Sequence, residues 1–167
     1  MSPLYGAASS EVLMGRSSAL YDLPLTSDES PFATEWGMAM TDDWKFTHNR
    51  ASKAEWGPGR RKIFEYRDLG IKDATNGDYV AQVTRANGSK APDDVQRWHR
   101  HHCDFQFLMV LQGWAEFEYE GEGLCRMEKG DVINQRPGIR HRELACSDDF
   151  EFLEIVSPAD FKTSLAE

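Results

Sequence analysis

Residues 99–113 read His-Arg-His-His-Cys-Asp-Phe-Gln-Phe-Leu-Met-Val-Leu-Gln-Gly, and this stretch decides the fold. Side chains alternate between the two faces of a β-strand, so His99 and His101 share one face and can converge on a single ion. On the same reasoning His102 points the other way. The apolar run from residue 105 to residue 111 predicts a buried strand directly after the histidines.

Short stretches with strand character surround this segment at even spacing. They lie at residues 61–67, 79–85, 114–120, 131–135 and 150–156, and Asn76-Gly77 and Asn87-Gly88 mark turns between them. Many short strands with Gly-rich turns are typical of an all-β sandwich or barrel. Only residues 158–165 look helical, with Pro158 in a first helical turn, so we expect a short C-terminal helix.

The N-terminal region differs from the rest, because proline and serine interrupt it and no helical periodicity runs through it. One interpretation is an extended arm that packs on a barrel, in the same chain or in a partner subunit. The other is a partly disordered tail up to about residue 30. Order is expected near Trp36, Trp44 and Trp56, and 36–40 could form a strand fragment. The predicted organisation is therefore an arm at 1–60, a barrel at 61–157 and a helical tail at 158–167.

Two motifs around the histidines resemble those of the cupin family, whose fold is a double-stranded β-helix, or jelly-roll barrel. His99-x-His101, four residues, Gln106, six residues and Gly113 resemble the first motif. The segment from Gly130 through Arg136-Pro137-Gly138 to His141 resembles the second. The resemblance covers about residues 95–157 and implies a divalent metal between His99, His101 and His141. It leaves the metal open among Fe, Zn, Ni, Cu and Mn.

Gln106 departs from the family pattern, which has glutamate at this position. An amide oxygen contributes only a dipole, so three neutral imidazoles and Gln106 would leave the charge of a divalent ion uncompensated. Such a site should hold its metal less tightly than a glutamate version and should attract an anionic ligand. Gln106 either ligates the metal or stays unligated and hydrogen-bonds a water or ligand, and the sequence leaves both open.

The strands beside the histidines predict an apolar pocket. Glu116, Glu118 and Glu120 alternate with Phe117 and Tyr119, so the two aromatic residues should face inward. Leu108 and Val110 are expected beside the metal. An apolar pocket with one ionic anchor is typical of a small-ligand site.

Glu143 follows His141 by two residues and can share its inward face. It is our candidate catalytic residue, as an acid/base group. It could also orient the metal site, or be a solvated carboxylate at a strand end.

Composition limits the class of partner. The formal charge is −9, the pI is about 5.0 and no basic patch is visible, so neither nucleic acid nor a membrane surface is an expected partner. Three cysteines without CxxC spacing fit a reducing compartment. No signal peptide or membrane-spanning run is recognisable, so we expect a cytoplasmic protein.

Three functions fit these residues. The first is a dioxygenase-like metalloenzyme that acts on a small anionic organic acid or aromatic compound. The second is a non-catalytic module that binds or senses a small ligand, and the third is a Zn- or Ni-dependent isomerase or lyase. By analogy with other proteins that carry an N-terminal arm, we also expect a homodimer.

Overall fold

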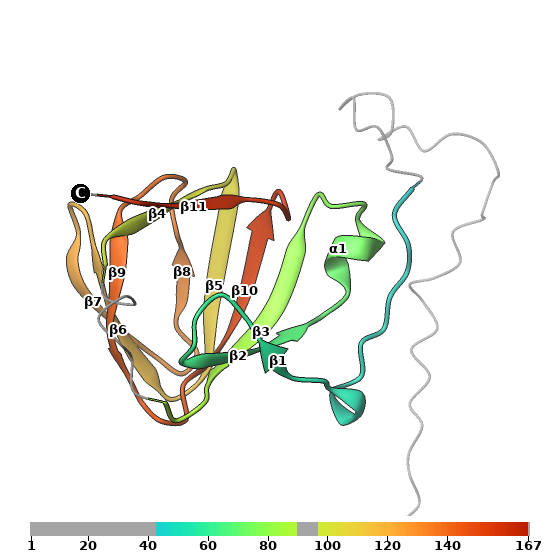
Figure 1. Ribbon diagram of the computed structural model, residues 1–167, viewed down its shortest axis with the longest axis horizontal. Coiled ribbons are helices and arrows are strands. Elements are labelled where there is room, and N and C mark those ends of the chain that lie inside the picture. Colours follow the sequence, from blue (N-terminus) through green and yellow to red (C-terminus); the bar gives the residue numbers. More distant parts are fainter. Residues whose placement is uncertain (1–42, 90–96, 167) are drawn as a thin grey trace, which may run out of the picture. The chain divides into compact units, whose positions relative to one another are not determined.

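The computed structural model describes residues 43–89 and 97–166, and two antiparallel sheets dominate them (Figure 1). The six-stranded sheet has the order β1 (Gly57–Pro58), β2 (Phe64–Asp68), β3 (Val80–Ala86), β10 (Glu151–Ser157), β5 (Phe105–Gln112) and β8 (Val132–Asn134). The five-stranded sheet has the order β11 (Lys162–Leu165), β4 (His99–His102), β9 (His141–Cys146), β6 (Trp114–Tyr119) and β7 (Gly123–Glu128). The expected all-β jelly-roll architecture is confirmed.

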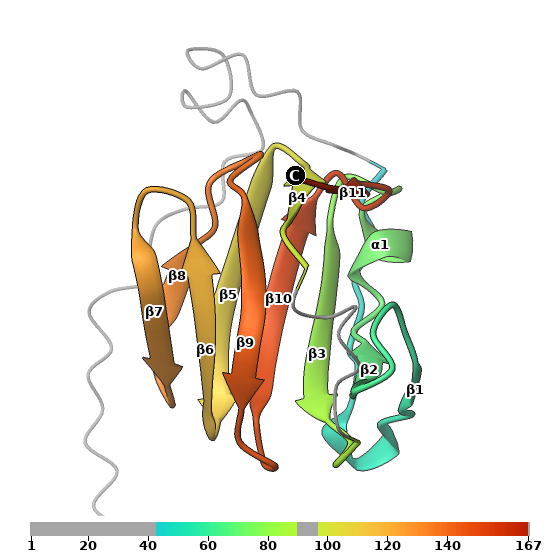
Figure 2. The same cartoon turned by 60° about the vertical axis from the view of Figure 1, so that its left-hand side comes forward.

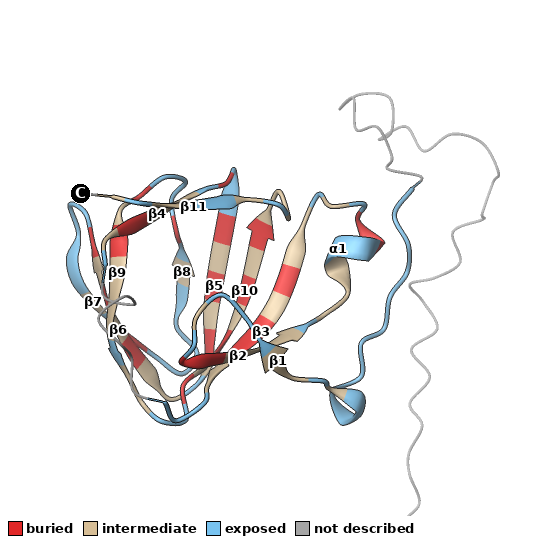
Figure 3. Ribbon diagram, viewed as in Figure 1, coloured by how far each residue is buried: buried red, intermediate tan, exposed pale blue. Residues whose placement is uncertain are grey.

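The core lies between the two sheets. Buried and partly exposed residues alternate along β5, β6 and β10, which appear as red and tan bands in Figure 3. Val110, Phe150 and Val156 are at most 1% exposed. Burial of each such side chain stabilises the fold by about 1.5–3 kcal/mol. The alternation in the sequence of residues 114–120 therefore correctly assigns which side of β6 faces the core.

Antiparallel pairing of β4 with β9 brings the two sequence motifs together. His99 and His141 are direct cross-strand partners in this pair. Figure 2 shows β6 and β9 side by side, with β5 and β10 behind them in the other sheet. The turn from β5 to β6 is at Gly113, which has φ +68° and where a Cβ atom would clash with Ser147 and with the main chain of Phe150. A glycine is therefore required at this turn.

The expected C-terminal helix is wrong. Residues Lys162–Leu165 form β11, which pairs with β4 from Lys162 opposite His102 to Leu165 opposite His99. The segment is too short for a helix to be stable by itself, whereas the free edge of β4 offers it a ladder of hydrogen bonds.

Two further elements lie outside the sequence-based expectations. β7 has one buried residue, Met127, so its alternation is too weak to read from the sequence. A helical turn, α1 (Ile71–Ala74), comes before the predicted Asn76-Gly77 turn, and both of those residues have positive φ.

Residues 43–60 are the described part of the predicted arm. They contain a 3₁₀ turn, η1 (Ala51–Lys53), and β1, which pairs with β2. Trp56 packs under the Arg85 guanidinium at 3.9 Å. Trp36 and the strand fragment predicted at 36–40 lie outside the described residues. Within the described ranges, no helix has the length and apolar character to cross a membrane.

Candidate metal centre

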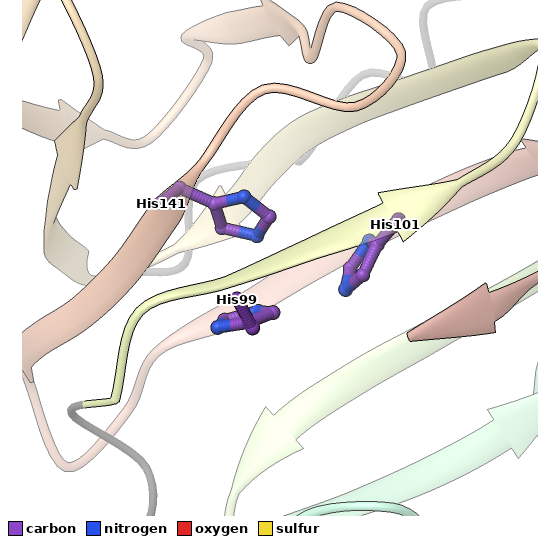
Figure 4. A group of neighbouring side chains, drawn as sticks. All are labelled: His99, His101 and His141. Atoms are coloured by element: carbon purple, nitrogen blue, oxygen red, sulfur yellow. The ribbon is translucent and has the colours of Figure 1, made fainter. Parts of the chain in front are cut away.

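Three histidine side chains meet at one point inside the fold. His99 and His101 come from β4 and His141 from β9, and Figure 4 shows the three rings gathered together. The ring centroids are 4.2 Å apart for His99 and His141, 5.0 Å for His101 and His141, and 5.2 Å for His99 and His101. One nitrogen from each ring lies within 4.8 Å of the other two. The three residues expected from the motifs are thus brought together and could hold one metal ion.

Each imidazole has its Nδ1 atom held by an acceptor. The Nδ1 atoms of His99 and His141 lie 3.0 Å from the main-chain carbonyl oxygens of the residues two positions earlier. His101 Nδ1 lies 2.9 Å from Gln106 Oε1. An oxygen acceptor fixes the proton on Nδ1 and leaves the lone pair on Nε2, which is the usual arrangement of metal-binding histidines. The donor set therefore fits a divalent metal bound through three Nε2 atoms.

Burial keeps these rings uncharged. It lowers the pKa of His101 to about 4 and that of His141 to about 3, and it also lowers the pKa of His99. His99 and His141 are each only 2% exposed. Because a metal binds the neutral imidazole, no proton has to leave these histidines on metal binding near pH 7.

Behind the histidines lies a set of hydrogen-bonded polar side chains that we call the amide network: Gln106, Gln135 and Glu154. Gln135 Nε2 donates to Gln106 Oε1 at 2.8 Å, and Gln106 Nε2 donates to Glu154 Oε1 at 2.7 Å. Gln82 donates to the other oxygen of Glu154, and the Tyr119 hydroxyl donates to Gln135 Oε1 at 3.0 Å. The network is buried, with Gln106 2% and Gln135 3% exposed.

The amide network fixes the orientation of Gln106. Because the Gln106 amide nitrogen donates to Glu154, its oxygen must face His101 and Gln135. Both ends of the amide are thus occupied by protein groups, which favours a role in orienting His101 over direct ligation of the metal. Cys103 packs beside Gln106 with its sulfur 4.0 Å from Oε1, whereas His102 is exposed and contacts Ser164 on β11.

A pocket of about 400 Å³ opens beside His99 and His101. Its charged side chains other than Glu154, which belongs to the amide network, form what we call the charged rim: Arg60, Arg61, Lys62, Arg97 and Glu143. The rest of the lining is Phe64, Tyr66, Phe152, Thr163 and Leu165. The pocket therefore offers four cationic side chains and three aromatic rings next to the metal ligands.

Arg61 connects the charged rim to the histidines, and Glu143 lies beside it. Arg61 Nη2 lies 3.0 Å from His99 Nε2 and 3.8 Å from Glu143 Oε1. Burial raises the pKa of Glu143 to about 7, against the opposing effect of Arg61. The other carboxylate oxygen of Glu143 is buried without a hydrogen-bond partner. Glu143 thus lies at the pocket and can exchange a proton near neutral pH. This position fits the acid/base role, which is one of the alternatives that the sequence left open.

The four residues expected to line the pocket lie elsewhere. Leu108, Val110, Phe117 and Tyr119 are buried in the core cluster, none is more than 5% exposed, and none lines the pocket beside His99. They face inward as predicted, but β2 also contributes to the interior and its aromatic residues line the pocket in their place. Tyr119 contacts the site in two ways, through its hydrogen bond to Gln135 and by stacking on the His141 ring, with the ring centroids 5.6 Å apart.

Sequence reasoning missed the arginines, Gln135 and the β2 side of the pocket. Arg60 falls at the end of the predicted arm and Arg61 at the start of the strand predicted at 61–67, whereas the structure has a turn at Arg61 and β2 begins at Phe64. Phe64 and Tyr66 alternate within a predicted strand, as do Phe152 and Glu154. These alternations could have identified the aromatic wall of the pocket, which consists of Phe64, Tyr66 and Phe152.

Residues 88–156 match the cupin domain family model. KdgF from Halomonas sp. shares the fold, with a TM-score of 0.52, 22% identity, and coverage of 65% of this chain and 92% of that one. The hydroxypropylphosphonic acid epoxidase from S. wedmorenis gives a TM-score of 0.51 at 17% identity, covering 69% and 61%. A chain from the structures of the DMSP lyases RdDddP and RnDddQII gives a TM-score of 0.52 at 14% identity, and the match covers 68% of this chain and 63% of that one.

Identities this low establish the fold alone. No curated protein matches the chain's sequence. The family model covers both histidine motifs, and the solved structures share the two-sheet barrel that brings the motifs together. Over residues 88–156, which contain both histidine motifs, the chain therefore matches the cupin domain family.

Proposed function

We propose that this protein is a metal-dependent enzyme that acts on a small organic acid. The observation that carries the proposal is the position of the pocket, because four cationic side chains surround an opening onto His99 and His101, two of the three neutral imidazoles. Three protein ligands leave coordination positions for a substrate, as in catalytic metal sites.

The charges of the site favour an anionic substrate. The three candidate ligands are all histidines, so no carboxylate ligand would compensate the charge of a bound divalent ion. Arg60 and Arg61 add positive charge, and Phe64, Tyr66 and Phe152 provide an apolar surface. A small acid with an aromatic or aliphatic body fits such a pocket.

A dioxygenase-like reaction is our first candidate, with an aromatic or keto acid as substrate. Bound iron would supply the redox chemistry that O₂ activation requires, and imidazole ligands suit Fe(II). His99, His101 and His141 would hold the metal, the charged rim would bind the acid, and the aromatic wall would exclude water from the reacting groups.

A proton-transfer reaction is the second candidate, and Glu143 favours it. Its carboxylate lies at the pocket with a pKa of about 7 and one oxygen without a hydrogen-bond partner, as a general base requires. A Zn- or Ni-dependent isomerase or lyase would use this group and no oxygen. The same fold occurs in an epoxidase and in DMSP lyases, so the fold does not choose between the two reaction classes.

The test begins with the metal content of protein purified without added metal or chelator. Iron-loaded protein is then assayed for oxygen uptake with a panel of aromatic and keto acids, in parallel with His101→Ala. Uptake that is lost in the variant supports the dioxygenase. Turnover that persists under anaerobic conditions supports the isomerase or lyase, and tight binding of an acid without turnover supports a ligand-binding module.

We also propose that the protein is cytoplasmic and forms a homodimer. The three cysteines are free, which suits a reducing compartment. Light scattering on the full chain tests the dimer, and a monomer mass would contradict it.

A further inference from the structure

Arg61 and a metal ion would use the same atom of His99. The Arg61 guanidinium lies 3.0 Å from His99 Nε2. Nδ1 of that ring faces the Arg97 carbonyl, so Nε2 carries the lone pair. One lone pair can accept a hydrogen bond or bind a metal, but it cannot do both. Arg61 must therefore leave Nε2 when a metal binds there.

A displaced Arg61 has the carboxyl group of Glu143 close by. Glu143 Oε1 is 3.8 Å away, and Glu143 Oε2 has no hydrogen-bond partner. Gln135 also contacts a metal-binding atom, His141 Nε2, at 3.2 Å, but it is neutral and its other contacts tie it to the amide network. Arg61 differs because it brings a full positive charge to the place where a cation would bind.

We propose that Arg61 couples metal binding to acid binding: it opposes the metal by occupying His99 Nε2, and it becomes the carboxylate-binding group of the pocket once the metal is bound. This inference rests on the proposed function and names the part of the substrate that is recognised, a carboxylate. A guanidinium binds a carboxylate through two parallel hydrogen bonds. A metal lies about 2.1 Å from its imidazole nitrogen, so one carboxylate can contact the ion and the displaced guanidinium together.

The coupling has a defined sign. A carboxylate that engages Arg61 removes the competitor of the metal, so the acid raises the affinity for the metal. By linkage, the metal raises the affinity for the acid by the same factor, about tenfold for a coupling of ordinary size. Arg61→Gln should move the two affinities in opposite directions, with tighter binding of the metal alone and weaker binding of the acid. A merely structural role would weaken both.

The experiment uses the full chain and Zn²⁺ as the probe metal. Its affinity is measured by competition with a chromophoric chelator, with and without pyruvate or benzoate as the probe acid. Arg61→Gln is compared with Arg61→Lys, which keeps the charge and loses the fork. Arg126→Gln removes an equal charge on β7, where Arg126 pairs with Glu116 and Glu128 outside the pocket.

In Arg61→Gln we expect Zn²⁺ alone to bind about tenfold more tightly, and the effect of the acid on the Zn²⁺ affinity to disappear. Arg61→Lys should keep the wild-type Zn²⁺ affinity and lose most of the coupling, and Arg126→Gln should behave as wild type. Equal Zn²⁺ affinities and equal coupling in wild type and Arg61→Gln would overturn this inference while leaving the metal site intact. Failure of the wild type to bind Zn²⁺ would overturn the metal site as well. Coupling as expected without turnover of any acid would overturn the proposed enzyme but support the role of Arg61.

Discussion

The amide network and the charged rim lie beside the same histidines, but they differ in how well their own polar atoms are hydrogen-bonded. In the network, Gln106 Oε1 accepts hydrogen bonds from His101 Nδ1 and Gln135 Nε2, and Gln106 Nε2 donates to Glu154. In the rim, Arg61 approaches Glu143 only to 3.8 Å, and one oxygen of Glu143 has no hydrogen-bond partner.

This difference separates two tasks. Buried polar groups that satisfy one another are rigid, and the amide network therefore holds the histidine rings in the orientation that a metal needs. A buried polar atom without a partner is costly, and in a native structure it can indicate a group that is completed by a ligand. We therefore assign ring orientation to the network and ligand recognition to the rim.

The largest effect should come from His101, because it is both a proposed metal ligand and hydrogen-bonded to Gln106 of the amide network. We expect His101→Ala to weaken metal binding by more than about a hundredfold, beyond the effect of losing an orienting partner. Elemental analysis should then find almost no metal per chain.

His102→Ala is the matched control for that variant. This neighbour is exposed and contacts Ser164 on β11, so its loss should leave the metal content unchanged. Equal metal loss in both variants would show that β4 is disturbed as a whole and that the face of the strand does not matter.

Gln106→Leu should disable the network while leaving the rim in place. The change removes the partner of His101 Nδ1 and of Glu154 Oε1, and it leaves Gln135 Nε2 with His141 as its remaining contact. Unsatisfied buried groups and a loosened ring should lower the free energy of unfolding by about 2–4 kcal/mol and weaken metal binding by about 10–100-fold. Urea unfolding and chelator competition measure the two effects.

Gln112→Leu provides the comparison, because Gln112 lies on the same strand but is exposed. Its effect on unfolding should stay within about 0.5 kcal/mol. If Gln106→Leu were equally mild, the network would not be a rigid support.

Gln106→Glu tests the amide network with a smaller change in the side chain than Gln106→Leu. The new carboxylate would face Glu154 Oε1, which now accepts from the Gln106 amide at 2.7 Å. Two carboxylates this close cannot both ionise freely, so the metal-free variant should be less stable at pH 8 than the wild type by about 1–3 kcal/mol. Metal should bind about tenfold more tightly and restore the stability, because the added charge compensates the ion. Thermal unfolding with and without Zn²⁺ tests this, and weaker metal binding would contradict it.

Much of the barrel and the ligand histidines could be predicted from the sequence because both depend on local rules. Alternation identified β3 and β6, an apolar run identified β5, and the spacing of two motifs placed His99, His101 and His141 together. The C-terminal strand could not be predicted in this way, since β11 exists because β4 has a free edge and not because of its own pattern.

The pocket wall was less predictable because it depends on which strand approaches the site from outside the motifs. Leu108 and Phe117 face inward and lie in the same core cluster as Phe64 and Phe152, but only Phe64 and Phe152 line the pocket. Arg61 lies in a turn, where side-chain direction follows from tertiary packing. Such contacts have no period in the sequence.

The smallest effect that separates the two regions is the pH dependence of stability in chelator-treated protein. Buried histidines have lowered pKa values, about 4 for His101 and about 3 for His141, so the unfolded chain binds more protons below pH 6.5 and stability falls as the pH drops from there. Glu143 acts in the opposite direction. Its pKa of about 7 lies above the 4.5 of the unfolded chain, so the folded state holds the proton longer and stability falls as the pH rises from 4.5 to about 7.

Glu143→Gln should remove only the second contribution. The stability of the wild type relative to this variant should therefore decline by about 1–3 kcal/mol between pH 5 and pH 8, with nearly all of the change below about pH 7.5. Urea unfolding at intervals of one pH unit measures it, and Glu118→Gln, on the partly exposed ion pair with Arg142, is the control without that decline. A difference that does not change with pH would mean that Glu143 is ionised and fully paired in the folded state. The rim would then resemble the amide network, and the assignment of ligand recognition to its unsatisfied carboxylate would fail.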